Sequence, residues 1–111
     1  MTNGMLYKAL ADMLAEASGT DEEIDKLLAR AFDIELAEFT SSAETARSLV
    51  AQVVPQATLR VGYDLRGILP SATINLGKFG ETAVAPTVPL AILQALVAVL
   101  LRSTRDPPEP D

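Results

Sequence analysis

The spacing of the hydrophobic residues changes near Thr58, and that change fixes the order of the elements along the chain. Before it, apolar residues recur every three or four positions, as they do along one face of an amphipathic helix. After it, Leu59, Val61 and Tyr63 alternate with polar or small residues, which predicts a strand. Together the two patterns predict helices over 5–17, 20–32 and about 41–53, strands over 58–64, 72–77 and 82–85, and a last helix from 88 to about 103.

This order predicts an α+β domain with a small antiparallel sheet, because the links between the strands are too short for parallel crossovers. The short link between the first two helices predicts an antiparallel helix hairpin at the N-terminus. A length of 111 residues fits one domain. We assign that domain to residues 1–103 and expect the proline-rich, acidic segment 104–111 to be a disordered tail.

Capping residues predict one end of each of the first three helices. Gly19 follows the first helix and is well placed for a left-handed C-terminal cap. Thr20 and Glu23 form a capping box that opens the second helix. For the third helix, Ser41 and Ser42 are competing N-caps.

The last helix is apolar nearly all round, and two interpretations of it stay open. One is a central helix covered by the sheet and the other helices. The other is a homodimer interface, since exposed aliphatic surface of that extent normally marks association. The residues that would form such an interface are Leu93, Leu96, Val97 and Leu100.

The residues missing from the composition exclude several classes of enzyme. The chain has no Cys and no His, so it holds no Ser-His-Asp triad, no cysteine nucleophile and no zinc site made of those residues. Asp21 and Asp25 share a helix face and have the chemistry to hold a hard cation. Acidic residues at a helix N-terminus are also explained by the helix dipole alone. We therefore expect no catalysis, no metal and no cofactor.

Negative charge is concentrated in the helical half of the chain. The net charge is −6, and residues 1–57 carry ten acidic and four basic residues, against five of each in 58–111. This balance argues against direct nucleic-acid binding, which needs clustered Lys and Arg. One interpretation is a solvated acidic face; the other is a surface that meets a basic protein. The candidate acidic partner surface consists of Asp21, Glu22, Glu23 and Asp25.

Three basic residues of the strand region are candidate anion contacts. Arg60 alternates onto the polar face of the first strand, while Arg66 and Lys78 lie in the two turns. If they gathered at one end of the sheet, they would attract a small anion or a nucleotide. The alternative is that all three are simply exposed to solvent.

The longest apolar run, Val88–Leu101, has 14 residues, whereas a bilayer span needs about 20. The N-terminal residues lack the basic and apolar regions of a signal peptide. We expect no membrane association and a cytoplasmic location.

Two segments resemble a family of small phage proteins. Residues 39–46 (FTSSAETA) resemble the aromatic-Thr-x-Ser helix opening of the phage ABA sandwich domain family. Residues 85–96 (APTVPLAILQAL) are similar to that family's terminal helix, and the hairpin over 10–32 looks like its N-terminal part. The resemblance implies an α/β/α sandwich, with helices on both faces of a small sheet. It implies no reaction, cofactor or catalytic residue.

These observations together predict a small, non-catalytic phage or prophage accessory protein that binds another protein in the host cytoplasm. A specific version is an anti-defence inhibitor, for instance of a CRISPR effector, whose acidic helices occupy a basic channel. The alternative is a small-anion or nucleotide-binding module that uses Arg60, Arg66 and Lys78.

Overall fold

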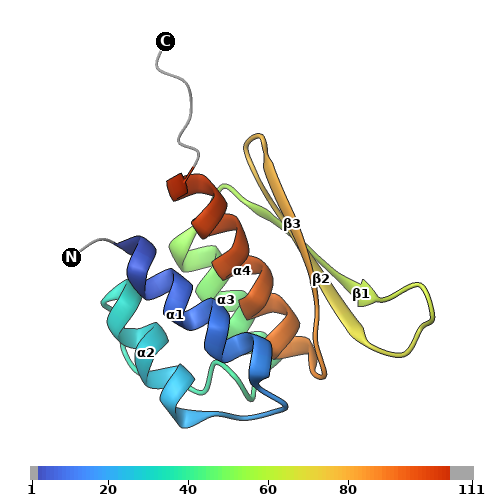
Figure 1. Ribbon diagram of the computed structural model, residues 1–111, viewed down its shortest axis with the longest axis horizontal. Coiled ribbons are helices and arrows are strands. Elements are labelled where there is room, and N and C mark those ends of the chain that lie inside the picture. Colours follow the sequence, from blue (N-terminus) through green and yellow to red (C-terminus); the bar gives the residue numbers. More distant parts are fainter. Residues whose placement is uncertain (1–2, 106–111) are drawn as a thin grey trace.

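The computed structural model describes residues 3–105, which form four helices beside one three-stranded sheet (Figure 1). Their order along the chain is the predicted one. The elements are α1 (Asn3–Glu16), α2 (Glu22–Phe32), α3 (Ala43–Val53), β1 (Thr58–Tyr63), β2 (Pro70–Leu76), β3 (Phe79–Val84) and α4 (Val88–Arg105).

The sheet is the predicted antiparallel meander, with strand order β1-β2-β3. Residue Tyr63 pairs with Pro70 at one end of β2, and Leu76 pairs with Phe79 at the other. The second connection is therefore a two-residue turn, and its first residue, Gly77, has a φ of 61°. Such turns need positive φ, which glycine adopts without steric cost. Because the turn is this tight, β3 begins earlier than the sequence predicts.

Helix α4 is the centre of the molecule. It contacts α1 and α3 on one side and β2 and β3 on the other. Leu93, Leu96 and Val97 have no exposed surface, and Leu100 is half-buried. Side chains fully buried within one chain cannot meet a second copy. Leu93, Leu96 and Val97 therefore cannot form the expected dimer interface, and α4 is the core helix of the alternative interpretation. For the half-buried Leu100, the interface stays a prediction.

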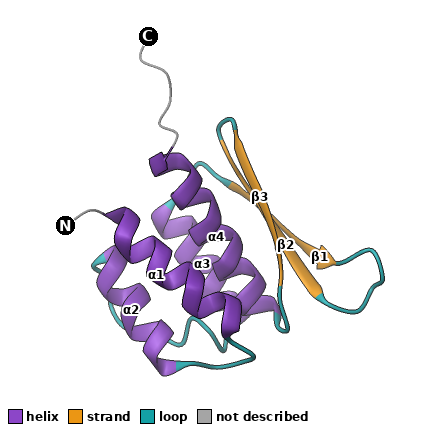
Figure 2. Ribbon diagram, viewed as in Figure 1, coloured by secondary structure: helices purple, strands orange, loops and turns teal. Residues whose placement is uncertain are grey.

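The α+β class and the N-terminal helix hairpin are confirmed, but the layering differs from the expectation. All helices of the described residues lie on one side of the sheet, rather than on both faces (Figures 1 and 2). The strands explain this difference. Ala72 and Ile74 are buried beneath α4, whereas on the opposite face the hydroxyls of Thr73 and Thr82 hydrogen-bond across the strands at 2.8 Å. That polar face offers little for a second helical layer to bury.

The helix ends differ from the predicted ones in detail. The N-cap of α2 is Asp21, not Thr20, and its carboxylate accepts the backbone N–H groups of Glu23 and Ile24. Gly19 does not have the left-handed conformation expected of it. Of the two competing N-caps of α3, Ser42 is the one used.

Helix α4 continues through Arg105, two residues into the segment predicted as a tail. The remainder of that predicted tail, 106–111, lies outside the described residues. None of the helices in residues 3–105 has the length and hydropathy needed to cross a membrane.

Candidate functional site

The loop between β1 and β2, residues 64–69, is built around Asp64. The backbone N–H of Asp64 donates to the Leu69 carbonyl at 2.9 Å, and the Asp64 carbonyl accepts from the Gly67 N–H at 2.8 Å. The Oδ1 atom of the same residue accepts the N–H groups of Ile68 at 3.0 Å and Leu69 at 3.4 Å. One side chain thus fixes the path of the whole loop.

The electrostatics of the loop favour the charged form of Asp64. The hydrogen bond from the Ile68 N–H lowers the pKa of the Asp64 carboxyl below its usual range, and the Leu69 N–H and Arg66 guanidinium act in the same direction. Partial desolvation opposes them without reversing the sign. The carboxylate that organises the loop is therefore ionised at neutral pH.

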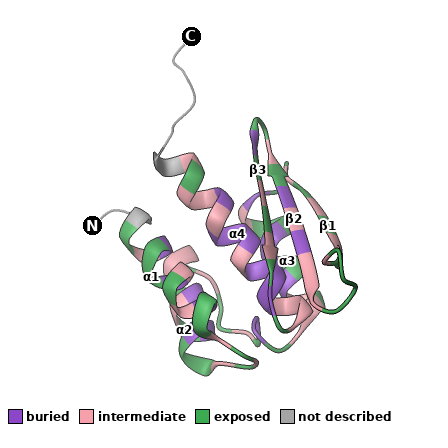
Figure 3. Cartoon of the chain, turned by 45° about the vertical axis from the view of Figure 1, so that its right-hand side comes forward, coloured by how far each residue is buried: buried purple, intermediate pink, exposed green. Residues whose placement is uncertain are grey.

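This ordered loop presents apolar side chains to solvent. We call Tyr63, Leu65, Arg66 and Ile68 the hairpin tip. Leu65 is fully exposed, and Tyr63 and Ile68 are each 65% exposed. They are three of the six large exposed hydrophobic residues in the described part of the chain. The tip projects from the body of the molecule, at the far end of the sheet from the Gly77 turn (Figures 1 and 3). Three exposed apolar side chains thus lie on, or directly before, a loop whose backbone Asp64 holds in place.

The structure does not bring the three candidate anion contacts together. Arg66 lies in the loop before Pro70, whereas Lys78 follows Leu76 at the opposite end of β2. Arg60 lies between these ends, opposite Thr73. Two of the three have other contacts: Arg66 pairs with Asp64 at 3.5 Å, and the Lys78 ammonium lies 5.5 Å from the centroid of the Phe79 ring. The prediction that they form a shared anion site is therefore wrong.

The four acids of the candidate partner surface divide into two pairs. Asp25 is only 5% exposed, and its carboxylate accepts the Thr40 N–H at 2.8 Å. The Thr40 hydroxyl in turn accepts the Asp21 N–H at 2.9 Å. Asp21 and Asp25 therefore fasten α2 to the residues before α3, while Glu22 and Glu23 remain exposed. Among the described residues, no cluster of acids is arranged to hold a metal ion.

A hollow lies between the start of α2 and the segment that leads toward α3. It has a volume of about 300 Å³ and includes Leu36, which is 57% exposed. We call it the acidic groove. Its lining residues are Thr20, Glu22, Asp25, Lys26, Leu36, Ala37 and Glu38.

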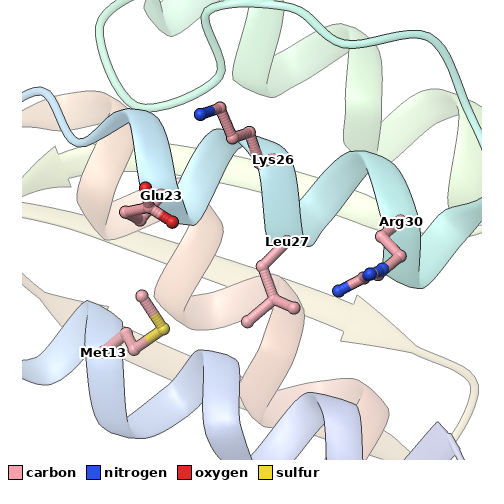
Figure 4. A pocket seen from close by; sticks show the side chains of 5 residues that line it. All are labelled: Met13, Glu23, Lys26, Leu27 and Arg30. Atoms are coloured by element: carbon pink, nitrogen blue, oxygen red, sulfur yellow. The ribbon is translucent and has the colours of Figure 1, made fainter.

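Another hollow separates α1 from α2, but its lining residues form no catalytic grouping. Met13 and Leu27 point toward one another across it, and Lys26 points away from α1 (Figure 4). Glu23 and Arg30 complete its lining. Both apolar side chains pack partly against the core. This hollow is part of the packing interface between α1 and α2.

The two halves of the chain differ in how their charges are neutralised. Among the side chains of residues 5–103, both ion pairs lie in the second half: Arg66 with Asp64, and Arg102 with Glu81 at 3.0 Å. The acidic residues of the helical half lack such partners in that range. The helical half therefore keeps its net charge of −6, most of it on exposed residues and part of it on Asp21 and Asp25.

No protein-family model, curated protein or solved structure matches this chain. The resemblance to the phage ABA sandwich domain family stays a prediction.

Sequence reasoning placed Arg66 and Gly67 in a turn but missed the hairpin tip. The available signal was the run Leu65-Arg66-Gly67-Ile68, because a turn rarely needs two large aliphatic residues. Only the backbone path of residues 64–69 shows that these side chains face solvent rather than the core.

Proposed function

We propose that this protein is a non-catalytic binding module that contacts another protein through the hairpin tip. The observation that carries the proposal is the full exposure of Leu65 on a loop held by Asp64. A loop backbone that is already ordered loses little conformational freedom on binding, so more of the side-chain burial contributes to affinity. Tyr and Arg are enriched among residues that dominate protein interfaces, and the tip holds one of each.

A photo-crosslinking amino acid at position 65 tests this proposal. The matched control carries the same amino acid at Gln52, which is exposed on α3. We expect a crosslinked protein from position 65 and none from position 52 when the chain is expressed in a bacterial host. The purified partner should then bind Leu65→Asp at least tenfold more weakly, since burying a leucine contributes about 1.5–3 kcal/mol.

Equal crosslinking at both positions would contradict the proposal, as would an affinity for Leu65→Asp equal to that of the wild type. Because Leu65 is fully exposed, the substitution should not unfold the protein, and an unchanged circular dichroism melt verifies this.

A second candidate function uses the acidic helical face. Glu22, Glu23, Glu35 and Glu38 are all exposed, and no ion pair between the described residues neutralises them. Such a face complements a basic protein, including one whose basic channel normally holds nucleic acid. This is the anti-defence version of the proposal, and it fits a phage accessory protein in the host cytoplasm.

Salt dependence distinguishes the two surfaces. Binding through the acidic face should weaken strongly as salt rises from about 50 mM to about 500 mM, because screening shortens the range of the field. Glu22→Gln with Glu23→Gln should weaken it further. Binding through the apolar side chains of the hairpin tip should depend on salt less strongly. Salt-independent binding that survives Leu65→Asp would contradict both candidates.

A further inference from the structure

We infer that the partner of the hairpin tip is the acidic groove of a second copy of this chain, so that copies associate head to tail. The inference rests on the proposed function of the tip and adds the identity of its partner. The two surfaces are complementary in polarity and charge, and they lie on opposite parts of the molecule (Figure 1).

The tip has exposed apolar side chains and one outward charge. Leu65 and Ile68 supply the apolar part. Asp64 points into the loop, with only 15% of its side chain exposed, whereas the Arg66 side chain is 70% exposed. The Arg66 guanidinium contacts Asp64 at 3.5 Å, but most of the Arg66 side chain stays exposed, so the outward charge of the tip is positive.

The acidic groove has the matching properties. It is hollow, with a volume of about 300 Å³, and the exposed Leu36 and half-buried Ala37 give it an apolar part. Glu22 and Glu38 are exposed carboxylates in its lining, and Lys26 is its single basic residue. Leu65 of one copy can cover Leu36 of another while Arg66 reaches Glu22 or Glu38.

Charge also selects between head-to-tail and two-fold association. In a two-fold contact the same patch meets itself, so Arg66 of one tip would lie near Arg66 of the other. Two grooves meeting each other would likewise oppose their carboxylates. Only the contact between tip and groove places opposite charges together, and like charges brought together disfavour the two symmetric alternatives.

The positions of the two surfaces determine the form of the assembly. The molecule measures 42 × 31 × 22 Å, with α2 toward one end of its long axis and the tip at the other (Figure 1). Each copy can use its tip and its groove at the same time. A contact of this type continues into an open chain of copies unless its rotation closes a ring.

Two matched substitutions test the inference. Leu65→Asp disables the tip and leaves the groove intact; Leu36→Lys disables the groove and leaves the tip intact. Both residues are exposed, so both variants should fold, and a circular dichroism melt is the check. Sedimentation velocity is measured from about 10 μM to about 1 mM, a range that covers contacts of micromolar to millimolar affinity.

We expect the wild type to form species larger than dimers as concentration rises, and each variant alone to stay monomeric. An equimolar mixture of the variants should form dimers and nothing larger, because it contains one working tip and one working groove. A wild type that stays monomeric at 1 mM would overturn this inference. A Leu36→Lys variant that still self-associates would also overturn it, because the groove would not be the receptor.

A different result would contradict the proposed function. If position 65 crosslinks to a different protein while the wild type stays monomeric, the tip binds proteins and only its assignment to a second copy is wrong. If position 65 crosslinks to nothing, the proposed function itself is wrong.

Discussion

The substitution Leu96→Ala tests whether α4 is a core helix or an association surface. Leu96 has no exposed surface, and its helix is enclosed by α1 and α3 on one side and by the sheet on the other. Elements packed on both sides leave little room for the cavity to collapse. We therefore expect a loss of about 3–5 kcal/mol in the free energy of unfolding, the upper part of the range for buried leucine.

This loss is a large fraction of the free energy of unfolding of a domain of this kind, which is about 5–15 kcal/mol. Urea unfolding followed by circular dichroism should show a lower midpoint with an unchanged slope. The melting temperature should fall by roughly 10 °C or more. The matched control is Leu65→Ala, the same substitution at a fully exposed position, which should change stability by less than about 0.5 kcal/mol.

A loss below about 1 kcal/mol for Leu96→Ala would refute the assignment of α4 to the core. So would a variant that keeps its stability but dissociates from a dimer into monomers, because that behaviour belongs to an interface helix.

Three further predictions concern the local contacts that fix the loops. Thr40→Val should lower the free energy of unfolding by about 1–3 kcal/mol in urea titrations, since it removes the hydroxyl that accepts the Asp21 N–H; an unchanged midpoint would contradict this role. Asp33→Gly should raise the free energy of unfolding by up to about 1 kcal/mol, because Asp33 has a φ of 52° at the end of α2, which glycine adopts without steric cost. A lower free energy of unfolding would show that the Asp33 side chain stabilises the fold by more than its backbone conformation costs. The pKa of the Asp64 carboxyl is lower in the folded chain than in the unfolded one. Its contribution to the free energy of unfolding is therefore present above the ordinary aspartate range and is lost as pH falls through the folded pKa. The Ile68 amide, followed by NMR, should lose its protection from hydrogen exchange in that acidic range but keep it at neutral pH.

The element order was predictable because each segment carries its own periodicity. The stripe of Ile24 and Leu28 fits a helix, and the alternation of Leu59 and Val61 fits a strand, whatever surrounds them. Pairing of short, adjacent strands then follows from chain connectivity. These are local properties, and the sequence contains them in full.

Long-range contacts were not predictable in the same way. Thr20 and Asp21 are both acceptable N-caps, and only the hydrogen bond between the Thr40 hydroxyl and the Asp21 N–H shows how this end of α2 is fixed. The burial of Asp25 depends on that same distant residue. The side of the sheet that the helices cover likewise depends on how α4 packs, and periodicity within one segment does not contain that information.

The hairpin tip was missed for a related reason. Aliphatic residues near a strand suggest the core, and nothing within 65–68 indicates that Asp64 turns the backbone outward. The spacing between Asp64 and Ile68 gives the loop its hydrogen bonds, but an aspartate followed by a turn also occurs where no partner binds. A site made of exposed apolar residues has no motif comparable to a catalytic constellation.

The central claim is that the hairpin tip is the contact surface and the acidic groove of another copy is its receptor. Amide chemical shifts recorded at increasing protein concentration test both halves of the claim at once. We predict that signals from 63–68 and from 20–38 shift or broaden together, while those of the Gly77 turn stay constant. Spectra that do not change up to about 1 mM, or changes confined to other surfaces, would contradict the account.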